Sequence, residues 1–475
     1  METMKEGKDQ VVGAEKKGKG KLEDLQKKDW AEPTASALNF EDEEVAKLIE
    51  KAKEMEANAK NGHIREASST FTEIFEEMKT KKFTASQRTL QCDLYSKIVK
   101  FHNEKHSYNE ALVWTFKIFD VFNPDTSSTR LKIDVCVNSA IAFLRKNEMG
   151  KAKALIEKAV ALAEKEFGPK SSMYAGTLLA YSEYLDKTDQ HQKNSNILET
   201  ALEIVEREEG KESVAYASIL SCIALNNVQH ERFRYRSVQQ ARQAVEILTK
   251  EVGEDNFLLV KPKNVLARLI HDNAMIHDDA MTMPSEDEKA MLLNEVEMLQ
   301  KEIIEVCKSH LGEFNPFTSH LMANLGLTWK EMGKLAEAEE MFNNSMKILV
   351  AIQGPDDLEV ARIHNRLAVL YEEDLEDFSK AEEHHLQSIR IAEKLFGPAF
   401  SKLQFSYVGL ISLYQKTGDE SKMVKYEEKY KEWRKLQEEK KSMEEKEEDE
   451  KMDIEAMVEF VKNTQFIETA PRLTA

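Results

Sequence analysis

A glycine that recurs at a nearly constant interval constrains this chain more than any other feature. The intervals are 42, 43, 59, 42 and 43 residues, between Gly168, Gly210, Gly253, Gly312, Gly354 and Gly397. A fixed period of this length marks a repeat array, in which each unit contacts mainly its neighbours. Such arrays offer an extended concave surface rather than a catalytic pocket, so binding is the class of function to expect.

The repeated unit is predicted to be a pair of helices. From about Glu41 to Leu436 apolar residues recur at i, i+3, i+4 and i+7, and prolines fall at the breaks. A small or apolar residue also recurs where the second helix of each pair begins: Ala111, Ala152, Ser195, Ser237, Ala338, Ala381 and Met423. We therefore predict an all-α superhelix of about nine helix pairs over residues 41–436.

Three segments depart from this pattern. Residues 1–40 are rich in Lys, Glu, Asp and Gly and are predicted to be a disordered charged N-terminus. The interval of 59 residues locates an insertion near residues 271–291, whose composition is typical of a solvated loop. Residues 437–475 are predicted to be a charged helical tail whose weakly amphipathic end could cap the last repeat.

Composition narrows the partners and the compartment. The net charge of −19 argues against general nucleic-acid binding. No apolar run approaches the ~20 residues that a membrane-spanning helix needs, and the N-terminus lacks an apolar secretory segment. The four cysteines form no Cys-x-x-Cys pair, as in reduced intracellular proteins. A cytoplasmic protein is expected.

Catalytic and metal-binding motifs are weak throughout the sequence. Residues 13–20, GAEKKGKG, fit the start of a phosphate loop but lack its Ser or Thr and follow no predicted strand. His102 and His106 lie one helical turn apart without a third ligand, so we interpret them as surface histidines. No Gly-x-Ser-x-Gly motif is present. We predict a protein that is not an enzyme and has no cofactor and no metal site.

The last repeats resemble a known family. Residues 354–397, GPDDLEVARIHNRLAVLYEEDLEDFSKAEEHHLQSIRIAEKLFG, are similar to the long tetratricopeptide repeats of kinesin light chains in their Gly-Pro-Asp opening, first helix and period. From about Leu131 to Leu436 the chain resembles the amyloid-protein-binding tetratricopeptide adaptors of that family. The residues that carry this resemblance are HLGEFNPFTSHLMANLG, KLAEAEEMF and the final unit FSYVGLISLYQKTGDESKMVKYEEKYKEWRKL.

The resemblance implies a cytosolic adaptor that binds short peptides or cytoplasmic tails. It also implies a link to microtubule-based transport and, as an alternative function, substrate recognition for a cullin-2-type ubiquitin ligase. The chain departs from the family where an elongin-contacting Leu-x-x-x-Cys box is expected, because Leu90 and Cys92 have the wrong spacing. The ligase function is therefore the weaker expectation, with motors or ligase subunits as further candidate partners.

The binding surface is expected along the first helix of each pair. The small residues Ala140, Ala267, Gly326, Ala368 and Gly409 are placed at the helix crossings, so residues two and three positions earlier should face the groove. These residues and the cations one turn away are the candidates: Asn138, Lys261, Asn264, Arg268, Asn324, Lys330, Arg362, Asn365, Arg366 and Tyr407. Asparagine can clamp a peptide backbone, and arginine can pair with a carboxylate. For any single residue, an ordinary solvated or inter-helix role is an equal alternative.

Overall fold

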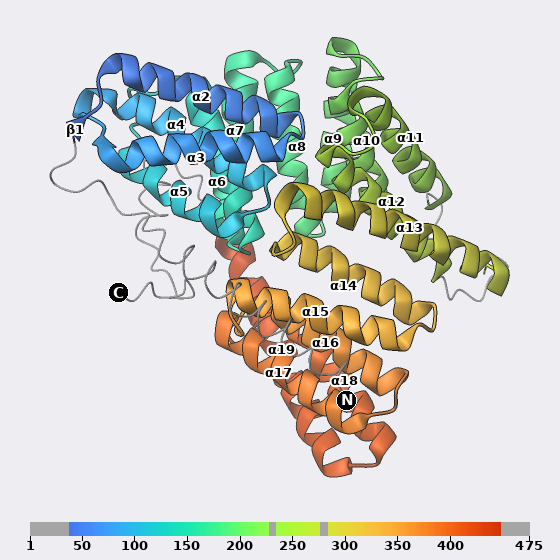
Figure 1. Cartoon of the computed structure of the whole chain (residues 1–475). Helices are drawn as coiled ribbons and strands as arrows, with labels where there is room; N and C mark the ends of the chain where they lie inside the picture. Colours follow the sequence, from blue (N-terminus) through green and yellow to red (C-terminus); the bar gives the residue numbers. More distant parts are fainter. Residues whose placement is uncertain (1–37, 228–233, 276–283, 448–475) are drawn as a thin grey trace, which may run out of the picture. The chain divides into compact units, whose positions relative to one another are not determined.

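The computed structural model describes residues 38–227, 234–275 and 284–447 of the 475-residue chain (Figure 1). These residues form two compact units. The N-terminal unit covers the described residues from 38 to 311, and the C-terminal unit covers residues 312–447. Each is a stack of helical hairpins, and within the described residues the hairpins number nine.

Six hairpins make up the N-terminal unit. Its helices are α2 (Asp42–Lys60), α3 (Ile64–Thr80), α4 (Arg88–Glu104), α5 (Tyr108–Val121), α6 (Thr129–Arg145), α7 (Met149–Phe167), α8 (Ser172–Lys187), α9 (His191–Glu208), α10 (Val214–Asn226), α11 (Arg234–Val252), α12 (Val260–Ala274) and α13 (Glu286–Leu311). Two short 3-10 turns, η1 (Ala85–Gln87) and η4 (Phe257–Leu259), precede α4 and α12. Each helix packs against the next in the chain except α3, because α4 packs against α2 instead. The first helices α4, α6, α8, α10 and α12 also contact one another in order.

Three hairpins make up the C-terminal unit. Its helices are α14 (Pro316–Glu331), α15 (Leu335–Gln353), α16 (Leu358–Glu373), α17 (Phe378–Phe396), α18 (Leu403–Thr417) and α19 (Glu420–Glu447). One apolar cluster runs from Ala323 of α14 to Trp433 of α19 and forms its core. The indole nitrogen of Trp433 donates to the carbonyl of Phe400 at 2.9 Å, which holds α19 against the turn between α17 and α18.

The hairpin of α14 and α15 explains the repeated small residues. Asn315 caps α14, since its side-chain oxygen accepts from the backbone nitrogens of Phe317 and Thr318. A Cβ atom at Gly326 would lie 2.9 Å from the ring of Phe342 in α15, so the two helices cross too closely for a side chain. The hairpin ends at Gly354, whose φ of 90° suits glycine.

The markers predicted at the start of the second helices are mostly buried. Those at 0–1% exposure are Ala111, Ala152, Ser237, Ala338 and Ala381. In α9 the buried residue is Asn194, and the neighbouring Ser195 is half-buried. The side chain of Asn194 donates to the side-chain oxygen of Asn226 in α10 at 3.1 Å. The register predicted for α9 is therefore one residue late.

The folded part of the chain differs from the predicted segment boundaries at two places. Leu38–Asn39 (β1) pairs in parallel with Lys81–Lys82 (β2), and Phe40 is buried, so the folded part begins before the predicted boundary at residue 40. The predicted insertion at 271–291 overlaps α12 and α13, and its middle lies outside the described residues, as do most of residues 1–40 and the predicted cap.

Histidine and cysteine placement tests further expectations. The interpretation of His102 as a surface residue is wrong: it is buried against Phe71 and Phe101, and burial lowers its pKa to about 3. The four cysteines are unpaired, and Cys92, Cys136 and Cys307 are buried. Within the described residues we find neither a metal-binding cluster nor a helix with the length and apolarity to cross a membrane.

Candidate protein-binding surfaces

Polar side chains link the first helices of successive hairpins at about one repeat period. Asn138 of α6 donates to the hydroxyl of Ser96 in α4 at 3.2 Å, and these residues are 42 positions apart. Arg366 of α16 donates to Asn324 of α14 at 2.7 Å across the same interval. Such bonds hold neighbouring first helices in register, and several of the predicted groove residues take part in them.

Asn138 lies between helices rather than on an open face. Its side chain is buried, and its amide nitrogen also lies 3.3 Å from the backbone oxygen of Ser96. Its donors are thus used within the chain, which corresponds to the inter-helix role left open by the sequence.

Lys261 of α12 belongs to an ion-pair bridge in the N-terminal unit. Its ammonium nitrogen lies 2.8 Å from one carboxylate oxygen of Glu183 in α8, and the guanidinium of Arg145 in α6 lies 2.6 Å from the other. Burial would raise the pKa of Glu183, but Lys261 and Arg145 lower it from 4.5 to about 2. Both cations of this bridge are therefore neutralised by a carboxylate of the same chain.

The other two candidates in α12 follow Lys261 along the helix. Arg268 is exposed and lies 3.8 Å from Asp272 on its own helix. Asn264 is half-buried, and its side chain makes no hydrogen bond to any described residue. Asn264 and Arg268 are thus more available to a ligand than Lys261.

Asn324 and Arg366 meet in the C-terminal unit. The side-chain oxygen of Asn324 accepts from one terminal nitrogen of Arg366, and the other terminal nitrogen is buried without a hydrogen-bond partner. Burial lowers the pKa of Arg366 to about 10, so it stays charged at neutral pH. Among the described residues no carboxylate forms an ion pair with this guanidinium, but the charge of Glu359 on the same helix acts on it and opposes the lowering of its pKa.

Arg362 and Asn365 lie on the same helix, α16. Arg362 is half-exposed and lies 3.4 Å from Glu359, which also pairs with His320 of α14 at 3.4 Å. The side-chain oxygen of Asn365 accepts from the hydroxyl of Ser406 in α18 at 3.3 Å. Together with Arg366, these residues place two guanidinium groups and one amide within two turns of a single helix.

Lys330 has its charge satisfied inside the C-terminal unit. Its side chain is 10% exposed, and its nitrogen lies 3.3–3.4 Å from carboxylates of Glu331, Glu373 and Asp374. Burial opposes the charged form, but the three carboxylates raise the pKa of Lys330. This lysine joins α14 to the end of α16.

Tyr407 faces the core, so its predicted orientation is wrong. Its side chain is 3% exposed, and its hydroxyl donates to Glu393 of α17 at 2.8 Å. The error follows from the assumed crossing, because the atoms nearest to Gly409 belong to His385 of the preceding helix α17. The exposed apolar side chains of α18 are instead Phe405 and Val408.

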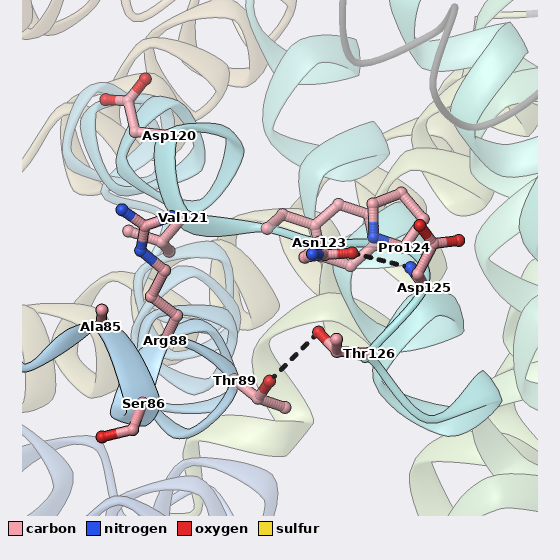
Figure 2. A pocket seen from close by; sticks show the side chains of 11 residues that line it. Ala85, Ser86, Arg88, Thr89, Asp120, Val121, Asn123, Pro124, Asp125 and Thr126 are labelled. Atoms are coloured by element: carbon pink, nitrogen blue, oxygen red, sulfur yellow. Dashed lines mark hydrogen bonds between the residues drawn. The ribbon is translucent and has the colours of Figure 1, made fainter.

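A surface pocket of about 590 Å³ lies elsewhere, in the N-terminal unit. It is lined by η1, the start of α4 and the loop between α5 and α6, and Figure 2 shows Arg88 extending toward the end of α5. The hydroxyls of Thr89 and Thr126 lie 3.5 Å apart across it. None of the predicted groove residues lines this pocket.

Comparison with known proteins identifies the repeat. Residues 318–394, within α14–α17, match the family model of the tetratricopeptide repeat. Residues 318–394 thus form a tetratricopeptide-repeat segment. It is 28% identical over 354 residues to amyloid protein-binding protein 2 of Mus musculus and 29% identical over 356 residues to that of Rattus norvegicus. Each alignment covers 74% of this chain and 59% of the relative, so the chain spans about three-fifths of the relatives' length.

A solved structure supports the same tetratricopeptide fold. A Rap protein, solved in complex with Competence and Sporulation Factor, aligns with a TM-score of 0.55 at 11% identity and covers 83% of this chain and 99% of that one. At this identity the likeness concerns the fold alone. The predicted all-α, tetratricopeptide-type superhelix is confirmed.

Two important residues of this tetratricopeptide chain were missed by the sequence analysis. Arg145 and Glu183 form the bridge with Lys261. Arg145 and Glu183 are 38 positions apart, and Glu183 and Lys261 are 78 positions apart. Neither separation is a multiple of the repeat period. A sequence signal exists only for the in-register pairs, such as Ser96 and Asn138.

Proposed function

We propose that this chain is a non-catalytic adaptor that binds a short acidic peptide on the C-terminal unit. The binding face consists of the first helices α14 and α16, with Arg366 as its main anchor. The observation that carries the proposal is that Arg366 is desolvated, is held by the neutral amide of Asn324, and has a terminal nitrogen without a partner.

Arg366 is suited to a carboxylate ligand. A carboxylate can accept two hydrogen bonds from one guanidinium, and partial burial strengthens such a pair. Asn324 orients the side chain without neutralising its charge. Half-exposed Arg362, four residues earlier and thus one turn away, would contact a second acidic group of the peptide.

The comparisons support protein binding in general terms. The name of amyloid protein-binding protein 2 states that it binds another protein, and the Rap structure holds a factor. By resemblance, the peptide would come from a cytoplasmic tail, and the adaptor would connect it to microtubule-based transport. The alternative is a substrate receptor of a cullin-2-type ubiquitin ligase, which co-purification with elongins and cullin would distinguish from the transport adaptor.

The test measures binding of a fluorescein-labelled hexaglutamate peptide by fluorescence anisotropy. Replacing Arg366 or Asn324 by alanine should each weaken binding by about 1–3 kcal/mol, as for a lost hydrogen bond to a charged group. The matched control is Arg390→Ala in α17, which removes an arginine that already pairs with Asp356 at 2.7 Å. The control should bind like the wild type.

Two results would contradict the proposal. One is unchanged hexaglutamate binding in the Asn324→Ala, Arg366→Ala double variant. The other is loss of binding together with an early thermal transition by circular dichroism, which would make these residues structural.

A further inference from the structure

The two ends of the N-terminal unit touch each other. In a linear repeat array each hairpin contacts only its neighbours. Here the side-chain nitrogen of Asn256, at the start of η4 in the sixth hairpin, donates to the backbone oxygen of Asn61 in the first hairpin at 2.9 Å. Helix α3 of the first hairpin also packs against α13 of the sixth. Asn61 and Asn256 are 195 positions apart in the sequence.

This end-to-end contact is tight. Gly62, in the turn between α2 and α3, faces Asn256 and Leu258, and a Cβ atom there would overlap the Asn256 side chain and lie 3.1 Å from Leu258. The neighbouring Phe257 ring lies 6.0 Å from that of His106 in the second hairpin. The sixth hairpin therefore meets both the first and the second.

A second link crosses the interior of the same unit. Lys261 reaches from α12 to Glu183 on α8, although the hairpin that begins with α10 lies between them in the chain. Arg145 approaches the same carboxylate from α6. One carboxylate thus joins the third, fourth and sixth hairpins.

We propose that the N-terminal unit is a latched ring whose six hairpins unfold cooperatively, as one unit. The latch consists of the contact of Gly62 and Asn61 with Asn256, together with the Glu183 bridge. Glu183 acts as an internal ligand that withholds Arg145 and Lys261 from other carboxylates. The latch goes beyond the proposed peptide site, which lies in the C-terminal unit. It removes the weak terminal hairpins that an open array would have.

Hydrogen exchange measured by mass spectrometry on the full chain tests the latch. Gly62→Ala adds a Cβ that collides with Asn256, and Gly210→Ala is the matched control. Both glycines have positive φ, 78° and 86°, but Gly210 has nothing within 4 Å. In Gly62→Ala, residues 254–260 should exchange at least tenfold faster than in the wild type, although they are distant in sequence.

In Gly210→Ala, faster exchange should stay near residues 208–214. If Gly62→Ala alters only the first two hairpins and leaves residues 254–260 at the wild-type rate, the array is open and the latch is refuted. If Gly62→Ala fails to fold, a milder variant tests the same contact. Asn256→Asp keeps the oxygen that accepts from Leu258 at 2.9 Å but loses the donor to Asn61.

Asn256→Asp should raise exchange at residues 60–64 severalfold. The matched control, Asn315→Asp, keeps the acceptor that caps α14 and should leave the rate at residues 60–64 unchanged. Equal rates at residues 60–64 in Asn256→Asp and the wild type would overturn the proposal.

Discussion

Replacing Glu183 by glutamine should destabilise the N-terminal unit by about 2 kcal/mol at pH 7. The substitution preserves shape but leaves the cations of Arg145 and Lys261 without their shared carboxylate. The difference between a pKa of 4.5 in the unfolded chain and about 2 in the fold corresponds to about 3 kcal/mol. The expected loss of stability is smaller than this, because the side chain of Lys261 is 55% exposed and solvent screens part of the attraction.

The pH dependence of the effect follows from the direction of the shift. Since the folded pKa of Glu183 is below the unfolded one, its stabilising contribution is complete above pH 4.5 and is lost as the pH falls toward 2. The difference in unfolding free energy between wild type and Glu183→Gln should therefore be constant from about pH 6 to 8 and shrink at pH 3.

Urea unfolding followed by circular dichroism measures this difference, with hydrogen exchange assigning the transition to the N-terminal unit. Glu246→Gln is the matched control, because Glu246 pairs with Lys250 at 2.8 Å on the exposed surface of the same unit. The control should unfold like the wild type. If Glu183→Gln also matches the wild type at pH 7, or if its deficit grows as the pH falls, the bridge does not stabilise the fold as argued.

Two further predictions concern the C-terminal unit and its register. Gly409→Ala should destabilise the protein by about 1–3 kcal/mol because the new methyl group overlaps the buried ring of His385, whereas Gly176→Ala in α8, with nothing within 4 Å, should be neutral or stabilising. Equal thermal midpoints for these two variants would contradict the close helix approach. Tyr407→Phe should cost about 1 kcal/mol through loss of its bond to Glu393 and leave hexaglutamate affinity unchanged. Weaker hexaglutamate binding with unaltered stability would instead indicate that Tyr407 contacts the peptide.

The repeat period was sufficient to predict the helical hairpins but not the rotation of every helix. Gly326 lies at a helix crossing as expected, and its neighbour Phe342 belongs to the same hairpin, whose two helices are joined by a short turn. Gly409 looks equivalent in sequence, yet it accommodates His385 from the preceding hairpin. A glycine indicates close approach without indicating which neighbour approaches, so Tyr407 was placed on the wrong face.

The recurring asparagines have two different roles, and sequence spacing alone cannot distinguish them. Asn138 and Asn324 both precede a small residue by two positions, and both bond to a side chain 42 residues away. For Asn138 the partner is Ser96, which leaves a neutral and satisfied pair. For Asn324 the partner is Arg366, which leaves a charged group whose hydrogen bonds are incomplete. The identity of the partner decides whether such a position can contact a ligand.

Charge distribution connects the two units to function. A chain with a net charge of −19 repels acidic peptides unless cations are concentrated without acidic partners. In the N-terminal unit, Arg145 and Lys261 are held by Glu183, and in the C-terminal unit Lys330 is held by three carboxylates. Arg366 differs because its hydrogen bond goes to an amide, and Glu359 on the same helix acts on it only electrostatically. In the proposed site, specificity for an acidic peptide would depend on the absence of a carboxylate at position 324, and Asn324→Asp should convert the site into another internal bridge.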